Sequence, residues 1–279
     1  MNEKKMPGKI LVGKDFQKEE LFIIKIGGNV IDDDQAFISF LKDFSNIQGK
    51  KILVHGGGKI ATSIGDKLGI QSKYIDGRRI TDDETIDLVT MVYGGLVNKK
   101  IVAALQSINC NAIGFTGADA DVMPAIKRPV KEIDYGWVGD INADRINTGI
   151  WELFLNNGLI PVLAPLTHDS NGHILNTNAD TMAAVLSISL SKCYDVKLIY
   201  CFEKNGVLEN VNDDASVITK LNRNTYQQLK ENKKLYAGIL PKIDNAFDAI
   251  NNGAKTVIIG NSSNVSQLIN GENGTKISG

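Results

Sequence analysis

Short apolar runs alternate with amphipathic stretches along most of this chain, after a charged, glycine-interrupted start. Such apolar runs are typical of buried strands, and the stretches between them have the period of helices that cover a sheet. The expected strands are Leu21–Ile26, Lys51–His55, Asn111–Phe115, Ile160–Ala164, Val196–Cys201 and Thr256–Ile259. The expected helices are Gln35–Ser45, Ile60–Leu68, Asp82–Gln106, Gly149–Asn156, Asp180–Ser191, Arg223–Glu231 and Ile243–Asn252. This alternation predicts an α/β fold with a mostly parallel sheet and crossover helices.

Local signals place turns and helix ends within this pattern. Thr81 followed by Glu84 predicts a capping box that opens the long third helix. The span 127–146 is polar and rich in turn residues, which favours hairpins. The stretch 168–172 is typical of a turn and is the best candidate for a boundary between lobes. No Pro- or Ser-rich linker marks a boundary between domains. We therefore expect two lobes that share one sheet, with an extension at 1–20, an N-terminal lobe at 21–170 and a C-terminal lobe at 171–279.

The composition narrows the class of protein. With 43% hydrophobic and 23% charged residues, the 279-residue chain has an ordinary globular composition. Its formal net charge of -1 gives no reason to expect nucleic acid or an anionic membrane as a partner. The three cysteines form no CxxC pair, which fits a reducing compartment. Neither a signal core nor an apolar stretch long enough to span a bilayer is visible, so we expect a cytoplasmic protein.

Two glycine clusters directly follow expected strands. Gly27 and Gly28 come after the first strand, with Lys25 just before them, and Gly56–Gly58 come after the second strand. In open α/β sheets, ligands bind beyond the carboxyl ends of the strands, where glycine lets backbone N–H groups approach an anion closely. A tight strand-to-helix turn is the plainer interpretation of either cluster alone. Two such clusters with a lysine beside one of them favour an anion site.

The chain lacks the two common phosphate-binding motifs. GxxxxGK[ST] is absent because Ile60 follows Lys59, and GxGxxG does not occur. Their absence argues against a P-loop enzyme and against a dinucleotide-binding dehydrogenase.

Further polar candidates stand later in the chain. Arg78 and Arg79 come just before the long third helix, and a guanidinium group can grip a carboxylate with two hydrogen bonds. Asn176, Asn178 and Asp180 alternate along the chain, so in an extended segment their side chains point the same way. A turn followed by a helix N-cap would use the same residue types.

A lysine at a helix start is the last candidate. Lys242 directly follows Pro241, where a cation opposes the helix dipole. We therefore interpret Lys242 as functional, with a solvated surface lysine as the alternative. His55, His168 and His173 are too scattered for a metal site, and we interpret them as structural or surface residues.

Five of these segments occur in a fixed order. They are KIGG at 25–28, HGGG at 55–58, GRRIT at 77–81, LNTNAD at 175–180 and GILPK at 238–242. Together they resemble the acetylglutamate kinases of the amino acid kinase family, over about residues 21–279. The terminal GTKI at 274–277 is similar to the last strand of that family. The resemblance implies a three-layer αβα sandwich, with the acyl amino acid in the N-terminal lobe, ATP in the C-terminal lobe, and a homodimer built on the long third helix.

The resemblance also implies roles for individual residues. Lys25 and Lys242 would stabilise the transferred phosphoryl group, and Asp180 would orient both lysines. The acyl amino acid would be bound by Gly57, Gly58, Arg79, Asn176 and Asn178. The nucleotide would be bound by Gly27, Gly28, Glu203 and Gly206.

The implied activity is transfer of the γ-phosphoryl group of ATP to the side-chain carboxylate of N-acetyl-L-glutamate, a step of arginine biosynthesis. A glutamate carboxylate has a pKa of about 4.3 and is ionised near neutral pH, so it needs no general base. The sequence offers no metal cage, and Mg²⁺ would be held chiefly by ATP oxygens and water.

Two departures from the family pattern leave alternatives open. Glu203 stands where the family usually has an Asp-containing turn, which affects individual nucleotide contacts. Lys59 stands beside the acyl pocket, where many members have proline. It could pair with the extra carboxylate of N-succinyl-L-glutamate, or it could point to solvent. A catalytically silent amino-acid-sensing protein is the alternative from another class, although a sensor has no use for both lysines and Asp180.

Overall fold

The computed structural model describes residues 18–75, 77–235 and 238–279. Most of the expected extension therefore lies outside the described residues. Within them, one large sheet contains β1 (Glu20–Ile26), β2 (Lys50–His55), β5 (Ala112–Phe115), β8 (Ile160–Leu163), β11 (Asp195–Phe202), β12 (Lys220–Asn222), β13 (Thr256–Asn261) and β14 (Thr275–Ser278). Small two-stranded sheets pair β3 (Tyr74–Ile75) with β4 (Arg78–Arg79), β6 (Ala125–Lys127) with β7 (Gly139–Ile141), and β9 (Leu166–His168) with β10 (Ile174–Asn176).

The large sheet is mostly parallel and has β1 near its centre. The strand order is β12-β14-β13-β11-β1-β2-β8-β5, and the β13–β14 pair is antiparallel. From Leu21 onward every residue of β1 is buried, because β11 and β2 flank it and helices cover both of its faces. Parallel strands align their carboxyl ends at one edge, so the segments after β1, β2 and β11 meet there.

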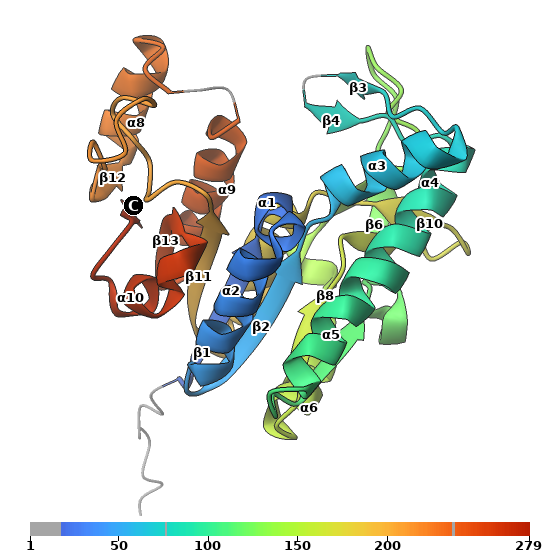
Figure 1. Cartoon of the computed structure of the whole chain (residues 1–279), viewed down its shortest axis with the longest axis horizontal. Coiled ribbons are helices and arrows are strands. Elements are labelled where there is room, and N and C mark those ends of the chain that lie inside the picture. The colour runs from blue at the N-terminus through green and yellow to red at the C-terminus, as the bar shows by residue number, and fades with distance from the viewer. Residues whose placement is uncertain (1–17, 76, 236–237) are drawn as a thin grey trace, which may run out of the picture.

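Helices cover both faces of the sheet and complete three layers. One face packs against α1 (Gly28–Asp32), α2 (Asp34–Asn46), α3 (Gly58–Leu68), α4 (Asp83–Val89), η1 (Thr90–Val97), α5 (Asn98–Gln106) and α10 (Val265–Asn270). The other face packs against α6 (Thr148–Asn156), α7 (Ala179–Leu190), α8 (Arg223–Glu231) and α9 (Leu240–Asn251). Figure 1 shows α2 and α5 running along the first face. The expected αβα sandwich is confirmed.

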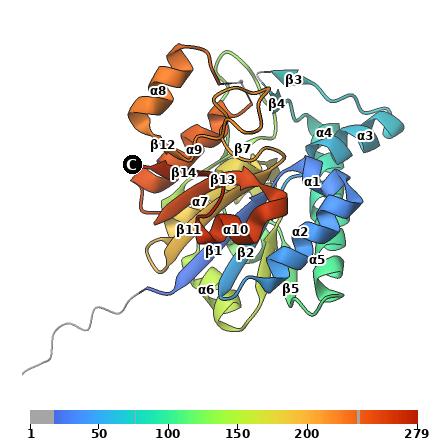
Figure 2. The same cartoon turned by 60° about the vertical axis from the view of Figure 1, so that its left-hand side comes forward.

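The β3–β4 hairpin and α8 stand at the same end of the molecule, on opposite sides of its upper part. Both views show this arrangement (Figures 1 and 2). It is also the end at which the carboxyl edge of the parallel strands lies. The boundary expected between residues 170 and 171 stays a prediction; β9 and β10 pair across it as an antiparallel hairpin.

The apolar pattern located the strands and helices that form the core. Each of the expected strands and helices is present within a few residues, and the hairpins expected over 127–146 include the β6–β7 pair. The terminal strand implied by GTKI is β14. The pattern missed short elements such as α1, α10 and β12, because they span too few residues for a period to emerge.

The start of the long third helix differs from the prediction. Asp82 is the N-cap, and its carboxylate accepts a hydrogen bond of 3.0 Å from the Thr85 N–H. Thr81 is instead bonded elsewhere: its hydroxyl receives a 3.0 Å hydrogen bond from Asn176 Nδ2. The capping box is therefore wrong. Asp82, one residue after Thr81, caps the helix instead, with a charged carboxylate in place of a hydroxyl.

The third helix runs without interruption through α4, η1 and α5. Its middle part, η1, is a π-helix, and the Asn98 N–H bonds to the Tyr93 carbonyl five residues earlier. By length and composition the 24-residue course Asp83–Gln106 could cross a membrane, contrary to our expectation. A core helix passes the same test, and 44% of the apolar window is buried in this fold.

Candidate active site

Two lysines and one aspartate from three separate elements meet at the carboxyl edge of the sheet. Lys25 stands near the end of β1, while Asp180 and Lys242 lie in the first turns of α7 and α9. Lys25 Nζ is 2.6 Å from Asp180 Oδ1, and Lys242 Nζ is 2.5 Å from Asp180 Oδ2. One carboxylate thus holds two ammonium groups, one on each oxygen.

Burial and charge act in opposite directions on this cluster. Burial alone would raise the pKa of Asp180, but the charges of Lys25 and Lys242 outweigh it and lower that pKa to about 2. Burial lowers the pKa of Lys25, and the charge of Asp180 partly offsets the shift. The aspartate is therefore ionised at every working pH, and it keeps two cations together where an anion can approach.

The two glycine clusters lie side by side at the same edge. Gly27 N–H donates to the Cys201 carbonyl at 3.3 Å, and Gly56 N–H donates to the Ile26 carbonyl at 3.2 Å. A Cβ built on Gly56 would lie 3.6 Å from the Gly28 nitrogen. Gly28 and Gly58 begin α1 and α3, so two helix N-termini lie at the edge of the sheet where β1, which carries Lys25, ends. Their positive ends suit an anionic ligand.

Arg79 on β4 reaches back to the second glycine cluster. Its Nη2 donates to the Gly58 carbonyl and to Thr62 Oγ1, each at 2.9 Å, and its Nη1 bonds to Ser72 Oγ. The side chain is buried, and Tyr74 covers its guanidinium at 4.9 Å from the ring centroid. The structure therefore brings Arg79 together with Gly58, as the motif match implied.

The two asparagines of the LNTNAD motif have separate positions. Asn176 ends β10 and bonds to Thr81, close along the chain to Arg79. Asn178 is exposed and caps α7, accepting a 2.9 Å hydrogen bond from the Thr181 N–H. The helix begins before Asp180, so the three side chains do not share one extended face. The N-cap interpretation holds for Asn178, while a substrate contact by it stays a prediction.

Lys59 lies in the first turn of α3 and is exposed. Among the described residues, no hydrogen bond or ion pair engages its ammonium group. Its part in acyl recognition stays a prediction.

The turn expected to bind the nucleotide follows β11. Glu203 is exposed, and its carbonyl accepts a 3.0 Å hydrogen bond from Asn261 Nδ2. Gly206 is buried, and a Cβ there would lie 2.7 Å from Thr275 Oγ1, so the packing of this turn onto β14 requires glycine. The turn lies at the same edge of the sheet as Lys25, but no described hydrogen bond joins it to the two lysines. Its contacts with a nucleotide stay a prediction.

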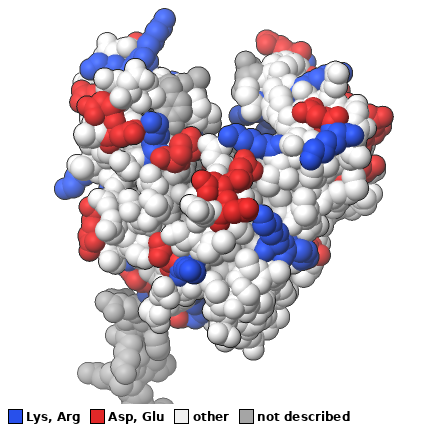
Figure 3. Space-filling view, in the orientation of Figure 1, with Lys and Arg blue, Asp and Glu red and all other residues white. Residues whose placement is uncertain are grey.

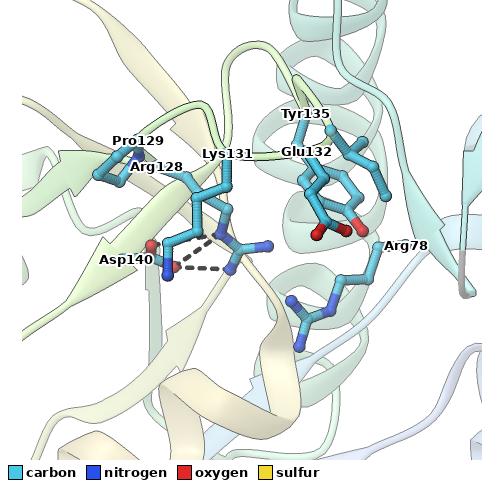
Figure 4. A pocket seen from close by; sticks show the side chains of 8 residues that line it. Arg78, Arg128, Pro129, Lys131, Glu132, Tyr135 and Asp140 are labelled. Atoms are coloured by element: carbon cyan, nitrogen blue, oxygen red, sulfur yellow. Dashed lines mark hydrogen bonds and ion pairs between the residues drawn. The ribbon is translucent and has the colours of Figure 1, made fainter.

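The surface is notched between the part that carries α8 and α9 and the part that carries β3 and β4, with charged side chains along the margins (Figure 3). A separate hollow of about 590 Å³ is lined by Arg78 and by the segment 128–140 (Figure 4). In it Arg128 Nη2 donates to Asp140 at 2.6 Å. Neither Lys25 nor Lys242 lines this hollow, so the candidate site is the Lys25–Asp180–Lys242 cluster.

The described part of the chain contains no group of three or more His, Cys, Asp or Glu side chains that could hold a metal ion. The carboxylate of Asp180 already has an ammonium group on each oxygen. A resident metal ion therefore does not fit the described residues of this cluster.

Sequence reasoning missed the residues that support the glycine cluster. Tyr93 packs against Gly57, where an added Cβ would lie 3.0 Å from the ring. His55, interpreted as structural or surface, is fully buried and bonded to Asn98. For His55, the sequence did contain an indication of a role at the site, because His55 directly precedes three glycines. For Tyr93 and Asn98, which lie within an apolar helix, the sequence contained no such indication.

Comparison with known proteins finds relatives over most of the chain. The model of the amino acid kinase family matches residues 20–261. An acetylglutamate kinase of Cytophaga hutchinsonii is 53% identical over 93% of this chain and 98% of its own. An acetylglutamate kinase of Bacteroides fragilis is 48% identical over 95% of this chain and 99% of its own. The structure of carbamate kinase from Giardia lamblia has a TM-score of 0.68 at 15% identity, covering 94% of this chain and 98% of that one, which shows a shared fold.

Proposed function

This chain belongs to the amino acid kinase family, and from that premise we propose that it transfers the γ-phosphoryl group of ATP to the γ-carboxylate of N-acetyl-L-glutamate in arginine biosynthesis. The observation that carries the proposal is the cluster of Lys25, Asp180 and Lys242 at the carboxyl edge of the sheet, in which Lys25 and Asp180 are buried and Lys242 is partly exposed. Two cations held by one carboxylate are suited to an anion that moves between two other anions. The names of the two acetylglutamate kinases described above support the choice of acceptor.

The reaction joins a carboxylate to a polyphosphate, so its main barrier is the approach of two anions. The acceptor is already ionised at neutral pH, with a side-chain pKa of about 4.3, and no base is required. In a loose phosphoryl-transfer transition state, catalysis consists of alignment and charge stabilisation. We assign that stabilisation to Lys25 from one side and Lys242 from the other, with Asp180 fixing the position of both ammonium groups.

We assign acceptor binding to the N-terminal lobe. Arg79 has five N–H donors, and three hydrogen bonds to the protein are described, which leaves donors for the α-carboxylate of the substrate. Gly57 and Gly58 would supply backbone N–H groups, and Asn176 stands on the neighbouring strand. The existing bonds hold Arg79 in place before the acceptor arrives, which lowers the entropy cost of binding.

We assign the nucleotide to the turns after β1 and β11. Gly27 and Gly28 would approach the phosphates, while Glu203 and Gly206 would lie along the nucleoside. The second substrate is MgATP, since the chain has no metal cage of its own among its described residues. Its Mg²⁺ would be bound by phosphate oxygens and water.

Two other readings are less well supported. The relatives named above are acetylglutamate kinases, which favours acetyl over succinyl as the acyl group. A silent amino-acid sensor would have no need for Lys25 and Lys242, because the two lysines stabilise charge that exists only during transfer.

We further propose a cytoplasmic homodimer that uses the third helix. Met91 and Leu96 on η1 are 56% and 52% exposed, although neighbouring residues of the same helix are fully buried. Large apolar side chains exposed on a long helix are typical of a protein interface. The three cysteines are free, and free thiols are typical of proteins in a reducing compartment.

The direct test is ADP release by the purified chain, measured with MgATP and a panel of acceptors. N-acetyl-L-glutamate should give the highest kcat/KM, ahead of N-succinyl-L-glutamate, free glutamate and aspartate. ADP release that does not depend on any acceptor, or a preference for an unacylated amino acid, would overturn the proposal.

A further inference from the structure

His55 connects the end of β2 to the glycine cluster through a defined pair of hydrogen bonds. Its Nδ1 lies 2.8 Å from the Gly56 carbonyl oxygen, and its Nε2 lies 3.1 Å from Asn98 Nδ2. Both side chains are completely buried. An amide nitrogen can only donate, so His55 Nε2 must accept and His55 Nδ1 must carry the proton that is donated to Gly56. The neutral ring is therefore held in one tautomer.

The orientation of the Asn98 amide is fixed by its other neighbours. Its Nδ2 also donates to the Val162 carbonyl at 2.9 Å, and its Oδ1 accepts from Lys99 Nζ at 3.2 Å. Rotating the amide by half a turn would set its oxygen against the Val162 carbonyl oxygen. Gly114 leaves the space for this amide, since a Cβ there would lie 2.0 Å from Asn98 Oδ1.

The π-helix explains how one helix places Tyr93 against Gly57 and Asn98 against His55. In an α-helix, residues five apart lie about 140° apart around the axis, because one turn takes 3.6 residues. In a π-turn the hydrogen bond joins a residue to the fifth before it, so the two share a face. The Asn98 N–H bonds to the Tyr93 carbonyl in this manner. Tyr93 consequently packs against Gly57 while Asn98 reaches His55.

The grip of His55 on Gly56 sets the direction of the next N–H group. A trans peptide has its C=O and N–H on opposite sides. With the Gly56 carbonyl held toward His55, the Gly57 N–H must point away from it. The Gly56 N–H donates a hydrogen bond to the Ile26 carbonyl oxygen. For the Gly57 N–H, by contrast, no hydrogen bond to a backbone carbonyl in the turns and loops is found among the described residues. Gly57 therefore presents a fixed donor at the mouth of α3.

From this geometry we infer that Asn98 and His55 are positioning residues: Asn98 holds His55 in its Nδ1–H tautomer, and His55 orients the Gly56–Gly57 peptide so that the Gly57 N–H is aimed at the acyl amino acid. The inference rests on the proposed function for the identity of that ligand. His55 itself is no acid or base in the reaction. Burial, and secondarily the charge of Lys25, lowers its pKa to about 4, so the ring is neutral.

The first test compares two substitutions of similar size at His55. The amide of His55→Gln can donate to Gly56 and accept from Asn98, whereas His55→Leu can do neither. We expect His55→Leu to raise the KM for N-acetyl-L-glutamate roughly ten-fold, the effect of one misaligned hydrogen bond, with the KM for MgATP changed by less than about two-fold. His55→Gln should recover most of the loss. Equal acceptor KM values in both variants and the native chain would overturn the inference.

The second test reads the tautomer directly. In ¹⁵N-labelled native protein at neutral pH, His55 should show a protonated Nδ1 and an unprotonated Nε2, with His55→Gln identifying its signals among the three histidines. Asn98→Leu should shift those signals toward a mixture of tautomers and raise the acceptor KM in parallel. A native ring protonated at Nε2 would contradict the inference, even if Asn98→Leu proves too unstable to study.

The two proposals fail in different ways. If the native chain does not phosphorylate N-acetyl-L-glutamate, the proposed function fails, while the native ring spectrum still reports on the arrangement of His55 and Asn98. If the native chain is active and the His55 pair shows no difference in acceptor KM, only the positioning role fails.

Discussion

The Tyr200 hydroxyl donates a 2.9 Å hydrogen bond to the backbone carbonyl oxygen of Asp180. Tyr200 is the residue of β11 that lies opposite Lys25 of β1 in the sheet. Tyr200, the strand neighbour of Lys25, thus holds the first turn of α7, which carries the aspartate that pairs with both lysines. Burial and then the charge of Asp180 raise the pKa of Tyr200 well above its ordinary value, so the hydroxyl stays protonated and donating.

Tyr200→Phe should therefore lower both stability and turnover. Losing one buried hydrogen bond should reduce the free energy of unfolding by about 1 kcal/mol, and a freer α7 start should lower kcat while leaving both KM values nearly unchanged. Urea unfolding and steady-state kinetics measure the two effects. Tyr135→Phe is the matched control, since no hydrogen bond of its hydroxyl is described. An unchanged kcat would show that the Asp180 backbone needs no such support.

Removing either lysine of the cluster should abolish most turnover. Lys25→Ala and Lys242→Ala each delete a charge that stabilises the phosphoryl group in transfer, so kcat should fall by about 10²–10³-fold, with smaller changes in KM. Lys192→Ala, which removes an exposed lysine paired with Asp144, is the control and should keep native kinetics. Circular dichroism establishes whether each variant is folded. A folded variant with near-native kcat would exclude that lysine from catalysis.

The pH dependence should show the lowered pKa of Lys25. A lysine stabilises the transition state only while protonated, and burial places its pKa below 10.5, so kcat should fall as pH rises through that lower value. Asp180, with a pKa of about 2, stays ionised and should cause no acidic limb above pH 4. In Asp180→Asn the alkaline limb should move to lower pH, because the attraction that raises the Lys25 pKa is gone. An alkaline limb unmoved by this substitution would contradict the assignment.

Arg79→Lys should weaken the acceptor specifically. A lysine ammonium group cannot bond at once to Ser72, Gly58 and Thr62 and still offer a planar pair of donors to a carboxylate. We expect the KM for N-acetyl-L-glutamate to rise roughly ten-fold or more, with the KM for MgATP nearly unchanged. Arg78→Lys on the same strand is the control. If the KM for MgATP rises more than the KM for the acceptor, the assignment of Arg79 to acceptor binding is wrong.

The strands and helices that form the core could be predicted from the sequence alone. Strands such as β1 are apolar throughout because helices bury both faces of the sheet. Such a strand can therefore be recognised from its own sequence, without knowing which strands lie beside it. Short elements such as β12 and α10 are held by their tertiary contacts instead. The cap of the third helix was misassigned for a related reason: Thr81 is drawn into a bond with Asn176, which is distant in the sequence, and Asp82 is left to cap.

The candidate site could be predicted only in part. The motifs named Lys25, Asp180 and Lys242, but nothing local says that residues so far apart share one carboxylate; the strand order brings them together. The alternation of the NTNAD segment suggested one face, yet the helix begins early enough to turn Asn178 outward. The support of the glycine cluster by His55 and Asn98 depends on a π-turn, which no apolar period indicates.

If the proposed function is right, this chain makes an acyl phosphate on the side chain of N-acetyl-L-glutamate. The most direct measurement is to incubate the purified chain with MgATP, the acceptor labelled with ¹⁸O in its γ-carboxylate, and hydroxylamine, and to analyse the products by mass spectrometry. The account predicts N-acetylglutamyl 5-hydroxamate in proportion to ADP, with one ¹⁸O atom transferred to phosphate, and neither product in Lys242→Ala. ADP formed without hydroxamate, or phosphate free of ¹⁸O, would contradict it.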